Sequence, residues 1–396
     1  MRRALAFLAA STVLSACTHV GGAASLPGVA SAPAVRTDAG GFASLYSFKG
    51  LPDGGSPAAG MTALGGTLYG TTQAGGQGDA GAVFATSTDG KERVIYSFGS
   101  GGIDGVFPVS GLIAVAGEFY GTATSGGDHG FGAVFKISKT GEEQLIYSFE
   151  GGNDGAQPYA PLVADGGVLY GTTYVGGGTN KNCTQGCGTV FAVTTSGKEH
   201  VVYRFKGGKT DGQGSVAGLI AINSLLYGTT ADGGKHGVGT IFKTSTAGKE
   251  QVLHSFGDGF DGAEPEAGLL NVGGKLYGTT NGAGKNFNGT VFVATTAGAE
   301  HVLYNFKGGG DGANPEASLI EYKGALYGTT AGGGTPNLGT IFGVSTGGKE
   351  HVVHAFKSTS EGSDPRAPLV AVSAALYGTT SLGGAAQMGT IFRITP

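Results

Sequence analysis

Short segments of alternating apolar and polar residues, separated by glycine-rich turns, follow one another from about residue 43 to the end of the chain. In E-H-V-L-Y-N-F (300–306), Val302, Tyr304 and Phe306 fall on one face of an extended strand, because side chains alternate along β-structure. No stretch shows the spacing of three and four residues that marks an amphipathic helix. The pattern predicts an all-β fold.

Four such segments make a unit that recurs along the chain. One unit consists of A-G-L-L-N-V (267–272), L-Y-G-T-T (276–280), G-T-V-F-V-A-T-T (289–296) and E-H-V-L-Y-N-F (300–306). The second segment marks seven copies through Tyr69, Tyr120, Tyr170, Tyr227, Tyr277, Tyr327 and Tyr377. These tyrosines are 50 or 51 residues apart, except for one interval of 57 that contains the insertion C-T-Q-G-C. Four-stranded units of this length are typical of β-propeller blades.

The two ends of the repeat region complement each other. The last unit stops after its third segment, G-T-I-F-R-I-T (389–395), whereas the first recognisable segment, A-S-L-Y-S-F (43–48), has the pattern of a fourth. We therefore predict a seven-bladed β-propeller with four antiparallel strands per blade. It is closed three-plus-one, with strand 43–48 pairing with 389–395. An open β-array with capping repeats is the alternative.

The repeat combines L-Y-G-T-T, G-T-V/I-F, G-K-E and F-x-G-G-x-D-G-x-x-P. It resembles the Gloeobacter/Verrucomicrobia-type (GloVer-type) tandem repeat of bacterial extracellular proteins, and its length is similar to that of kelch propeller repeats. The resemblance covers about residues 42–396. It implies an exported, surface-associated protein, and it brings no established ligand or catalytic mechanism.

The N-terminus has the features of an export signal. Two arginines precede an apolar stretch at 4–14, and L-S-A-C (14–17) resembles a bacterial lipobox. This resemblance implies removal of residues 1–16 and attachment of lipid to Cys17, whose acyl chains would anchor the protein durably. An ordinary secretory peptide cut after Ala24 is the alternative.

Residues 17–41 are mostly Ala, Gly, Pro, Ser and Val, which predicts a flexible tether ahead of the propeller at 42–396. Thr18 follows the cysteine at the position where an aspartate would favour retention in the inner membrane. We therefore expect an outer-membrane lipoprotein that faces the periplasm or the cell surface and contacts the membrane only through its lipid.

Composition excludes several other classes of protein. With 81 Gly and 13 Pro among 396 residues, the chain is still 40% hydrophobic, which is too apolar for a disordered protein. A net charge of −4 with dispersed Lys and Arg gives no reason to expect a nucleic-acid partner. No apolar run reaches the roughly 20 residues that span a bilayer. We expect a monomer without a cofactor or a bound metal.

Two of the three cysteines remain once Cys17 is assigned to the lipid. Cys183 and Cys187 lie in C-T-Q-G-C, and an oxidising compartment permits a disulfide between them. Because the closed loop is so short, the bond would stiffen it and add roughly 2 kcal/mol at most. Metal binding by the pair is the alternative, although no histidine is near enough in sequence to complete a tetrahedral site.

The loop after the fourth segment carries an acidic residue followed by glycine in every copy. These residues are Asp53, Asp104, Asp154, Asp211, Asp261, Asp311 and Glu361. Together they could form a ring of carboxylates at one mouth of the propeller that binds cations or basic groups. Alternatively, each aspartate bonds to its own loop backbone, as is common in Asp-Gly turns.

The loops between the second and third segments differ most among the copies, and we expect them on the same face as the Asp-Gly loops. Variable loops on a rigid scaffold commonly carry recognition. Candidate ligand-binding residues on this face are Asp128, His129, Asp232, Lys235, His236 and Lys285, together with Asp104, Asp154, Asp261 and Asp311. His254 and His354 instead replace the tyrosine of segment four, which indicates packing.

The sequence contains no G-x-S-x-G, H-E-x-x-H or P-loop motif, and we predict no catalytic residues. The expected function is noncatalytic: a lipid-anchored propeller that presents a loop-rich face to a glycan or a protein of the cell envelope. One alternative is a carbohydrate-active propeller enzyme, a polysaccharide lyase or hydrolase, that uses His129 or His236. Another is an envelope-assembly scaffold that binds partners by strand addition.

Overall fold

The computed structural model describes residues 36–37, 41–100 and 103–396. The predicted signal peptide, Cys17 and most of the predicted tether lie outside the described residues. The chain divides into the units Met1–Ala34 and Val35–Pro396, so the boundary falls inside the predicted tether. Only the second unit is described below.

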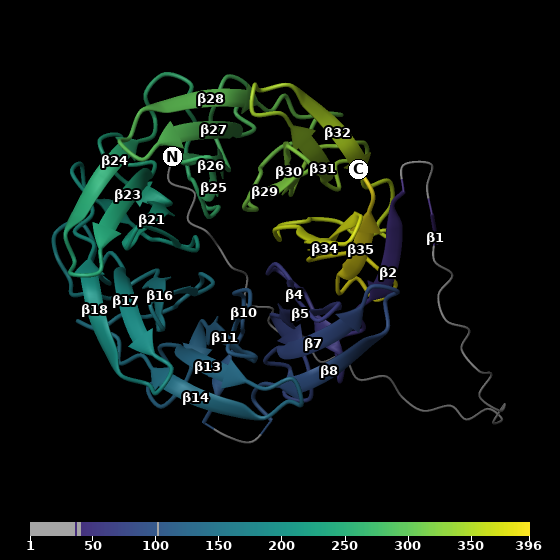
Figure 1. Cartoon of the computed structure of the whole chain (residues 1–396), viewed down its shortest axis with the longest axis horizontal. Coiled ribbons are helices and arrows are strands. Elements are labelled where there is room, and N and C mark those ends of the chain that lie inside the picture. The colour runs from purple at the N-terminus through teal and green to yellow at the C-terminus, as the bar shows by residue number, and fades with distance from the viewer. Residues whose placement is uncertain (1–35, 38–40, 101–102) are drawn as a thin grey trace, which may run out of the picture. The chain divides into compact units, whose positions relative to one another are not determined.

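Seven sheets of four main strands follow one another around a common axis, with the first strand of each innermost and the fourth outermost (Figure 1). The part of the chain that the structure describes contains strands and turns but no helix, and therefore no helix able to cross a membrane. The seven-bladed β-propeller predicted from the repeat is confirmed.

We number the sheets as blades 1 to 7. Blades 1 to 3 consist of β4 (Thr62–Leu64), β5 (Thr67–Thr72), β7 (Ala82–Ser87) and β8 (Glu92–Ser97); β10 (Ile113–Val115), β11 (Glu118–Ala123), β13 (Ala133–Ile137) and β14 (Glu143–Ser148); and β15 (Val163–Asp165), β16 (Val168–Thr173), β17 (Thr189–Thr194) and β18 (Glu199–Arg204). Blades 4 and 5 consist of β20 (Ile220–Ile222), β21 (Leu225–Thr230), β23 (Thr240–Ser245) and β24 (Glu250–Ser255); and β25 (Leu270–Val272), β26 (Lys275–Thr280), β27 (Thr290–Thr295) and β28 (Glu300–Asn305). Blade 6 consists of β29 (Ile320–Tyr322), β30 (Ala325–Thr330), β31 (Thr340–Val344) and β32 (Glu350–Ala355).

Blade 7 combines the two ends of the repeat region. It contains β33 (Val370–Val372), β34 (Ala375–Thr380), β35 (Thr390–Ile394) and β2 (Ala43–Ser47). β2 pairs antiparallel with β35, with Ala43 opposite Arg393 and Ser47 opposite Thr390. A two-residue strand, β1 (Arg36–Thr37), adds to the outer edge of β2 (Figure 1), although these residues belong to the predicted tether.

The hydrophobic core is divided among the boundaries between blades. At each boundary the phenylalanine that follows a fourth strand packs against the phenylalanine in the third strand of the next blade, with ring centroids 5.0–5.5 Å apart. The seven pairs are Phe48–Phe84, Phe98–Phe135, Phe149–Phe191, Phe205–Phe242, Phe256–Phe292, Phe306–Phe342 and Phe356–Phe392. The aromatic columns therefore supply packing between blades.

The fourth strands depart from simple alternation. In blade 5, Val291 pairs with Tyr304 and Phe292 with Val302, so Leu303 is an extra residue in a β-bulge. As a result Leu303 and Tyr304 pack against the same core cluster. Val302 and Tyr304 therefore lie on opposite faces, and the expectation that they share one face is wrong. The same shift in register recurs in every blade.

Two sets of loops meet on one face of the propeller, which we call the loop face. The loop after each fourth strand pairs with the loop between strands two and three of the next blade. In three blades the pairing forms small sheets: β3 (Gly54–Gly55) with β6 (Ala74–Gly75), β9 (Gly105–Val106) with β12 (Ser125–Gly126), and β19 (Gly212–Gln213) with β22 (Asp232–Gly233). In the other four the contact is a single bridge, Ala156–Val175, Ala263–Gly282, Ala313–Gly332 or Ser363–Leu382.

Candidate functional site

The same two backbone hydrogen bonds recur on the loop face in every blade, and we call the backbone segments that they join the frame. The N–H of the residue after L-Y-G-T-T donates to the carbonyl of a residue in the preceding loop, as from Asn281 to Glu264 at 3.0 Å. The N–H of that loop residue in turn donates to the neighbouring blade, as from Glu264 to Val238 at 2.9 Å. Both of these backbone N–H groups are hydrogen-bonded in all seven blades. The frame is therefore held by its backbone and does not depend on which side chains it carries.

The loop residue in this frame has a left-handed backbone in every blade. Its φ is 52–58° at six non-glycine positions and 65° at the seventh, which is glycine. The seven residues are Ser56, Phe107, Gln157, Gly214, Glu264, Asn314 and Asp364. A left-handed backbone costs a residue with a Cβ roughly 1–2 kcal/mol, whereas glycine adopts it freely. Side chains are therefore kept at this position against a conformational cost, which is typical of functional surfaces.

At two more positions of the frame the residue type also differs from blade to blade, although the residues on either side follow the repeat. One lies two residues further along the loop and holds Ala58, Val109, Tyr159, Val216, Glu266, Glu316 and Arg366. The other follows L-Y-G-T-T and holds Gln73, Thr124, Tyr174, Ala231, Asn281, Ala331 and Ser381. We call these three sets of seven residues the variable ring. Sequence reasoning missed the variable ring, although its signal is a position that changes inside a repeated string.

Polar side chains in blades 5 to 7 connect one side of the variable ring. Asn281 Nδ2 donates to Glu266 Oε2 at 2.9 Å, and Asn314 Nδ2 donates to Asn281 Oδ1 at 3.1 Å. This hydrogen-bonded chain therefore crosses from blade 5 to blade 6.

Arg366 continues the polar side into blade 7. Its Nη1 lies 3.2 Å from Glu316 Oε2, and its Nε donates to both carboxylate oxygens of Asp364 at 2.8 Å. Ser381 Oγ also donates to Asp364, at 2.8 Å. These contacts orient unlike groups on a shared surface, as a recognition site requires.

The polar side of the ring is acidic. Burial, reinforced by the neighbouring Glu316, raises the pKa of Glu266 to about 7, and burial also raises the pKa of Glu316 in spite of Arg366. An aromatic pair lies on the variable ring in blade 3: the rings of Tyr159 and Tyr174 meet edge to face with centroids 5.7 Å apart. Burial and the nearby carboxylate of Asp232 raise the pKa of Tyr174, so its hydroxyl stays protonated.

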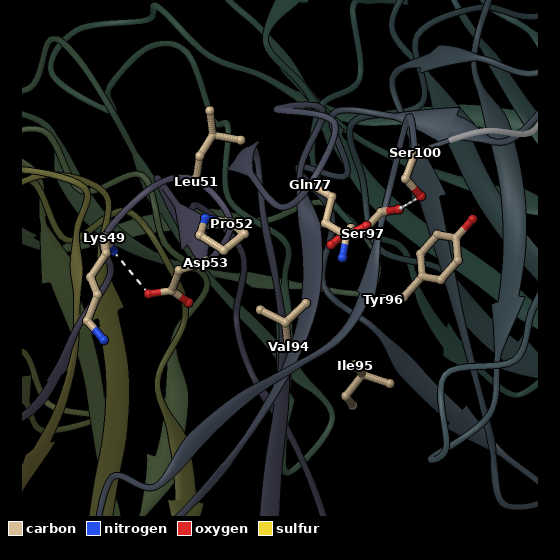
Figure 2. A pocket seen from close by; sticks show the side chains of 10 residues that line it. All are labelled: Lys49, Leu51, Pro52, Asp53, Gln77, Val94, Ile95, Tyr96, Ser97 and Ser100. Atoms are coloured by element: carbon tan, nitrogen blue, oxygen red, sulfur yellow. Dashed lines mark hydrogen bonds between the residues drawn. The ribbon is translucent and has the colours of Figure 1, made fainter.

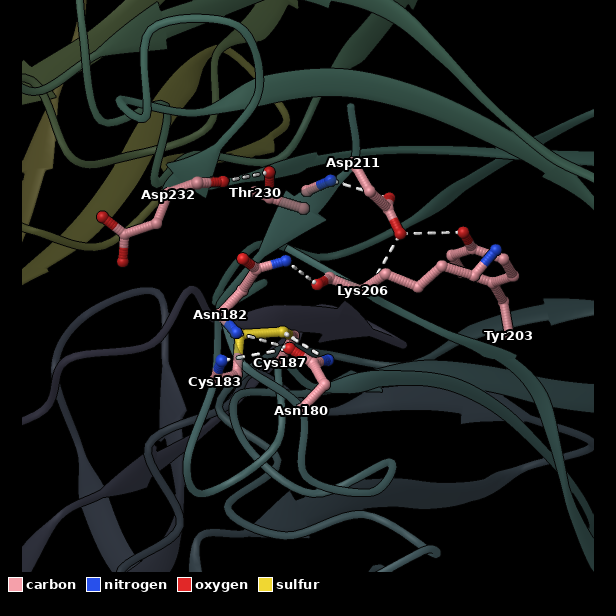
Figure 3. Close-up of a disulfide and its surroundings, with 10 residues drawn as sticks. Asn180, Asn182, Cys183, Cys187, Tyr203, Lys206, Asp211, Thr230 and Asp232 are labelled. Atoms are coloured by element: carbon pink, nitrogen blue, oxygen red, sulfur yellow. Dashed lines mark hydrogen bonds between the residues drawn. A yellow bond between two sulfur atoms is a disulfide. The ribbon is translucent and has the colours of Figure 1, made fainter. Parts of the chain in front are cut away.

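The Asp-Gly carboxylates lie at the outer rim and not at the mouth of the ring. Each accepts a hydrogen bond from the tyrosine or histidine of the outermost strand, over 2.7–3.3 Å. Each also accepts a backbone N–H from its own loop, as Asp211 does from Lys206 at 2.7 Å (Figure 3). Asp104, Asp154, Asp261 and Asp311 are therefore loop-closing residues, and His254 and His354 take the place of the tyrosine in this contact.

A glutamate from the next blade approaches five of these tyrosine–aspartate pairs and the His254–Asp261 pair. The six residues are Glu92, Glu143, Glu199, Glu250, Glu300 and Glu350. Burial is the main cause that raises the pKa of each to about 7, and a neighbouring aspartate adds to it. The Oε1 atom of each is buried without a hydrogen-bond partner among the described residues. Four of these glutamates lie in the G-K-E string of the repeat, and Glu143 and Glu300 lie at the same place in G-E-E and G-A-E. Their partners lie in another blade and so are not visible from spacing.

The loop-tip candidates are exposed and lie apart. Asp128 and His129 belong to blade 2, Lys235 and His236 to blade 4, and Lys285 to blade 5. Lys235 Nζ pairs with Asp258 at 3.1 Å within its own blade. Of the predicted loop residues, only Asp232 lies beside the variable ring, where its charge acts on Tyr174.

All eight exposed large hydrophobic residues of the described chain lie in loops of the loop face. They are Leu51, Ile103, Phe107, Phe131, Phe260, Phe287, Leu382 and Met388. The turns of the opposite face contribute none of them. Apolar groups gathered on one side of a soluble fold indicate a surface that contacts another molecule.

An open groove of about 590 Å³ lies at the boundary of blades 7 and 1 (Figure 2). The loop of Lys49, Leu51 and Asp53 forms one side, and β8 forms the other with Tyr96. Asp53 is already used by the hydroxyl of Tyr46 at 2.7 Å and by the N–H of Lys49 at 3.1 Å. The carboxylate of Asp53 is therefore already engaged by hydrogen bonds.

Cys183 and Cys187 form a disulfide, as predicted (Figure 3). Both are buried against Phe205, and Asn180 and Asn182 tie the same loop together. Asn182 Nδ2 donates to the carbonyl of Lys206 at 2.9 Å, which joins the insertion to the loop after the fourth strand of its own blade. The disulfide therefore stiffens part of the loop face.

Comparison with solved structures gives the fold alone, because the three matches below are only 13–15% identical to this chain. A computationally designed protein, Ika8, matches with a TM-score of 0.50 and 15% identity over 89% of this chain and 99% of its own. A luciferin-regenerating enzyme matches with a TM-score of 0.44 and 13% identity, covering 87% of this chain and 92% of its own. A putative 6-phosphogluconolactonase from Bacteroides uniformis matches with a TM-score of 0.47 and 15% identity, covering 78% and 86%. No curated protein matches the chain in sequence.

The family comparison is more specific, because it covers nearly the whole chain. The model of the Gloeobacter/Verrucomicrobia repeat matches residues 16–184 and 177–392. These ranges include all seven copies of L-Y-G-T-T or its variant, and the resemblance noted from the repeat is confirmed. The chain belongs to the Gloeobacter/Verrucomicrobia repeat family.

Proposed function

We propose that this protein is a noncatalytic binding module that holds a glycan on the variable ring. The observation that carries the proposal is the left-handed position of the frame, where six of seven blades keep a side chain although glycine would cost less. The backbone around that position is the same in every blade, so the blades differ there only in the chemical type of the side chain. A rigid frame with variable side chains is suited to recognition.

The side chains of the ring favour a hydroxyl-rich ligand without acidic groups. Glu266 and Glu316 can accept hydrogen bonds from sugar hydroxyls, and the amides of Asn281 and Asn314 can both donate and accept. The Tyr159–Tyr174 pair offers ring surface to the apolar face of a sugar. Carboxylates outnumber the single arginine here, so uronic acids and phosphates would be repelled.

We further propose that the module is exported and anchored in the outer membrane through lipid on Cys17. The L-S-A-C string and the disulfide at Cys183–Cys187 support this location, since disulfides persist in oxidising compartments. Mass spectrometry of the mature N-terminus tests it: acylated Cys17 is expected. An unmodified N-terminus at another residue would contradict the anchor.

Binding to an array of neutral, amino and acidic glycans tests the proposed ligand class. We expect binding to neutral or amino glycans, weakened about tenfold or more in Asn281→Ala and Glu266→Gln, since one lost hydrogen bond in a recognition site costs on the order of 1.4 kcal/mol. Asp89→Asn, at an exposed turn of the opposite face, is the matched control and should bind normally. Failure of the whole array to bind, or unchanged binding in both variants, would refute the proposal. Turnover of a bound glycan that Glu266→Gln abolishes would show an enzyme instead.

A protein of the cell envelope is the second candidate partner. The eight exposed apolar side chains of the loop face favour it, because such groups contribute more to protein contacts than to glycan contacts. Cross-linking in cells distinguishes the two. Phe287, which is 78% exposed, is the informative position, and Phe287→Ser should reduce a protein cross-link while leaving glycan binding intact.

A further inference from the structure

The boundary between blades 4 and 5 departs from the repeat in two ways. His254 on β24 replaces the tyrosine that five other blades carry, and Gly257 follows where three blades have a lysine above the tyrosine ring. The carboxylates of this boundary therefore face an imidazole and have no lysine from that position beside them. This combination occurs at no other boundary of the described propeller.

Three possible ligand atoms converge here from three separate segments. His254 Nε2 lies 3.0 Å from Asp261 Oδ2 and 4.0 Å from Glu300 Oε2, and all three atoms are within 4.8 Å of one another. The side chains are largely buried, with 19%, 9% and 7% of their surface exposed. The other oxygen of Glu300, Oε1, is buried without a hydrogen-bond partner in the described structure.

We propose that His254, Asp261 and Glu300 form a binding site for Zn²⁺. Imidazole nitrogens and carboxylate oxygens are both zinc ligands, and Zn–N and Zn–O bonds of about 2.0–2.2 Å place tetrahedral ligands roughly 3.2–3.6 Å apart. The distances of 3.0 and 4.0 Å bracket that spacing. Calcium fits poorly, because it takes six to eight oxygen ligands. The fourth position would be left to water, and the ion would join β24 to β28 across the blade boundary.

The boundary between blades 6 and 7 is an internal comparison. His354 Nε2 lies 3.3 Å from Glu361 Oε2, so the histidine and one carboxylate are again present. Phe42, however, precedes β2 at the position of Glu300, and its ring stacks on His354 at 3.9 Å between centroids. With an aromatic ring in place of the third ligand, this boundary should not hold zinc.

Zinc titration of the purified full chain, carrying a tag without histidine, tests the site. We expect one Zn²⁺ per chain by calorimetry, and a visible absorption band of tetrahedral type when Co²⁺ is used instead. His254→Tyr restores the residue of five other blades and should weaken Zn²⁺ binding at least tenfold, as should Glu300→Gln. His354→Tyr is the matched control and should bind like the original chain.

A chain that takes up no Zn²⁺ or Co²⁺ would overturn the proposal, and so would a His254→Tyr variant that binds them as tightly as the original. If His254→Tyr does not fold, Glu300→Gln decides by the same criterion. Loss of binding in His354→Tyr as well would place the ion elsewhere and reject the assignment. The readout is metal binding, so it is independent of any ligand of the variable ring.

Discussion

At the residue scale, the same position of the repeat acts differently according to what lies across the blade boundary. Tyr304 donates to Asp311 at 2.9 Å beside Glu350, whereas His354 approaches Glu361 beneath the ring of Phe42. The tyrosine column was visible in the sequence. The role of the six buried glutamates was not visible in the sequence, because each glutamate approaches residues of the preceding blade.

The buried glutamates should make stability depend on pH. The pKa of Glu143 rises from 4.5 to about 7, chiefly because of burial and then because of Asp104. The folded chain thus holds this proton to a higher pH than the unfolded chain does. The free energy of unfolding should therefore fall as the pH rises from about 4.5 to about 7. Glu143→Gln cannot ionise, so it should be more stable than the original chain at about pH 8, by on the order of 1 kcal/mol after solvent screening, and little changed at about pH 4.5.

Urea denaturation of both chains at the two pH values measures this difference. Glu142→Gln is the matched control, because Glu142 is the exposed neighbour and should show no such pH-dependent gain. Equal stability of Glu143→Gln and the original chain at both pH values would mean that Glu143 is ionised in the fold at no cost.

At the element scale, strand identity follows from the repeat, but the detail of packing does not. A glycine inside a strand such as L-Y-G-T-T often marks a close approach of two backbones. Here it instead makes room for side chains: a Cβ added at Gly171 would lie 2.5 Å from Phe191 Cζ and 2.9 Å from Leu162 Cδ2. The bulge in each fourth strand was likewise missed, because it depends on the pairing partner.

Gly171→Ala should therefore destabilise the protein through overpacking. The added methyl group would push the ring of Phe191 or the side chain of Leu162 out of place, at a cost of roughly 1–3 kcal/mol. Gly310→Ala is the matched control, since its added Cβ would meet nothing within 4 Å. Thermal melting monitored by circular dichroism compares the two, and an equal melting temperature for both variants would contradict this account of the glycine.

At the scale of the whole molecule, blades 7 and 1 are joined by the same contacts as any other pair. Thr379 Oγ1 donates to the carbonyl of Pro57 at 3.4 Å, which corresponds to the bond from Thr122 to Pro158 at 3.2 Å. Phe48 also packs on Phe84 as its counterparts do elsewhere. The boundary is therefore continuous across the ends of the repeat region.

Removal of the N-terminal strand should weaken the entire ring. A chain that begins at residue 49 lacks β2, leaves the edge of β35 unpaired and loses the rings of Phe42 and Phe48. We expect a loss of at least about 5 kcal/mol, from the two buried aromatic rings alone, and aggregation through the open edge. A chain that begins at residue 41 keeps β2 and should melt as one cooperative unit. Size-exclusion chromatography and melting curves compare them, and equal behaviour would show that β2 contributes little.

The sequence by itself determined the architecture of this protein. Strand number, blade number and the aromatic columns follow from a short string repeated seven times, because local pattern and period are properties of the chain. Only the tertiary structure decided which residues meet. The polar connections around Glu266, Glu316 and Arg366, and the convergence of His254, Asp261 and Glu300, join segments of different blades. Contacts between blades depend on how neighbouring sheets pack, and spacing along one repeat carries no record of that packing.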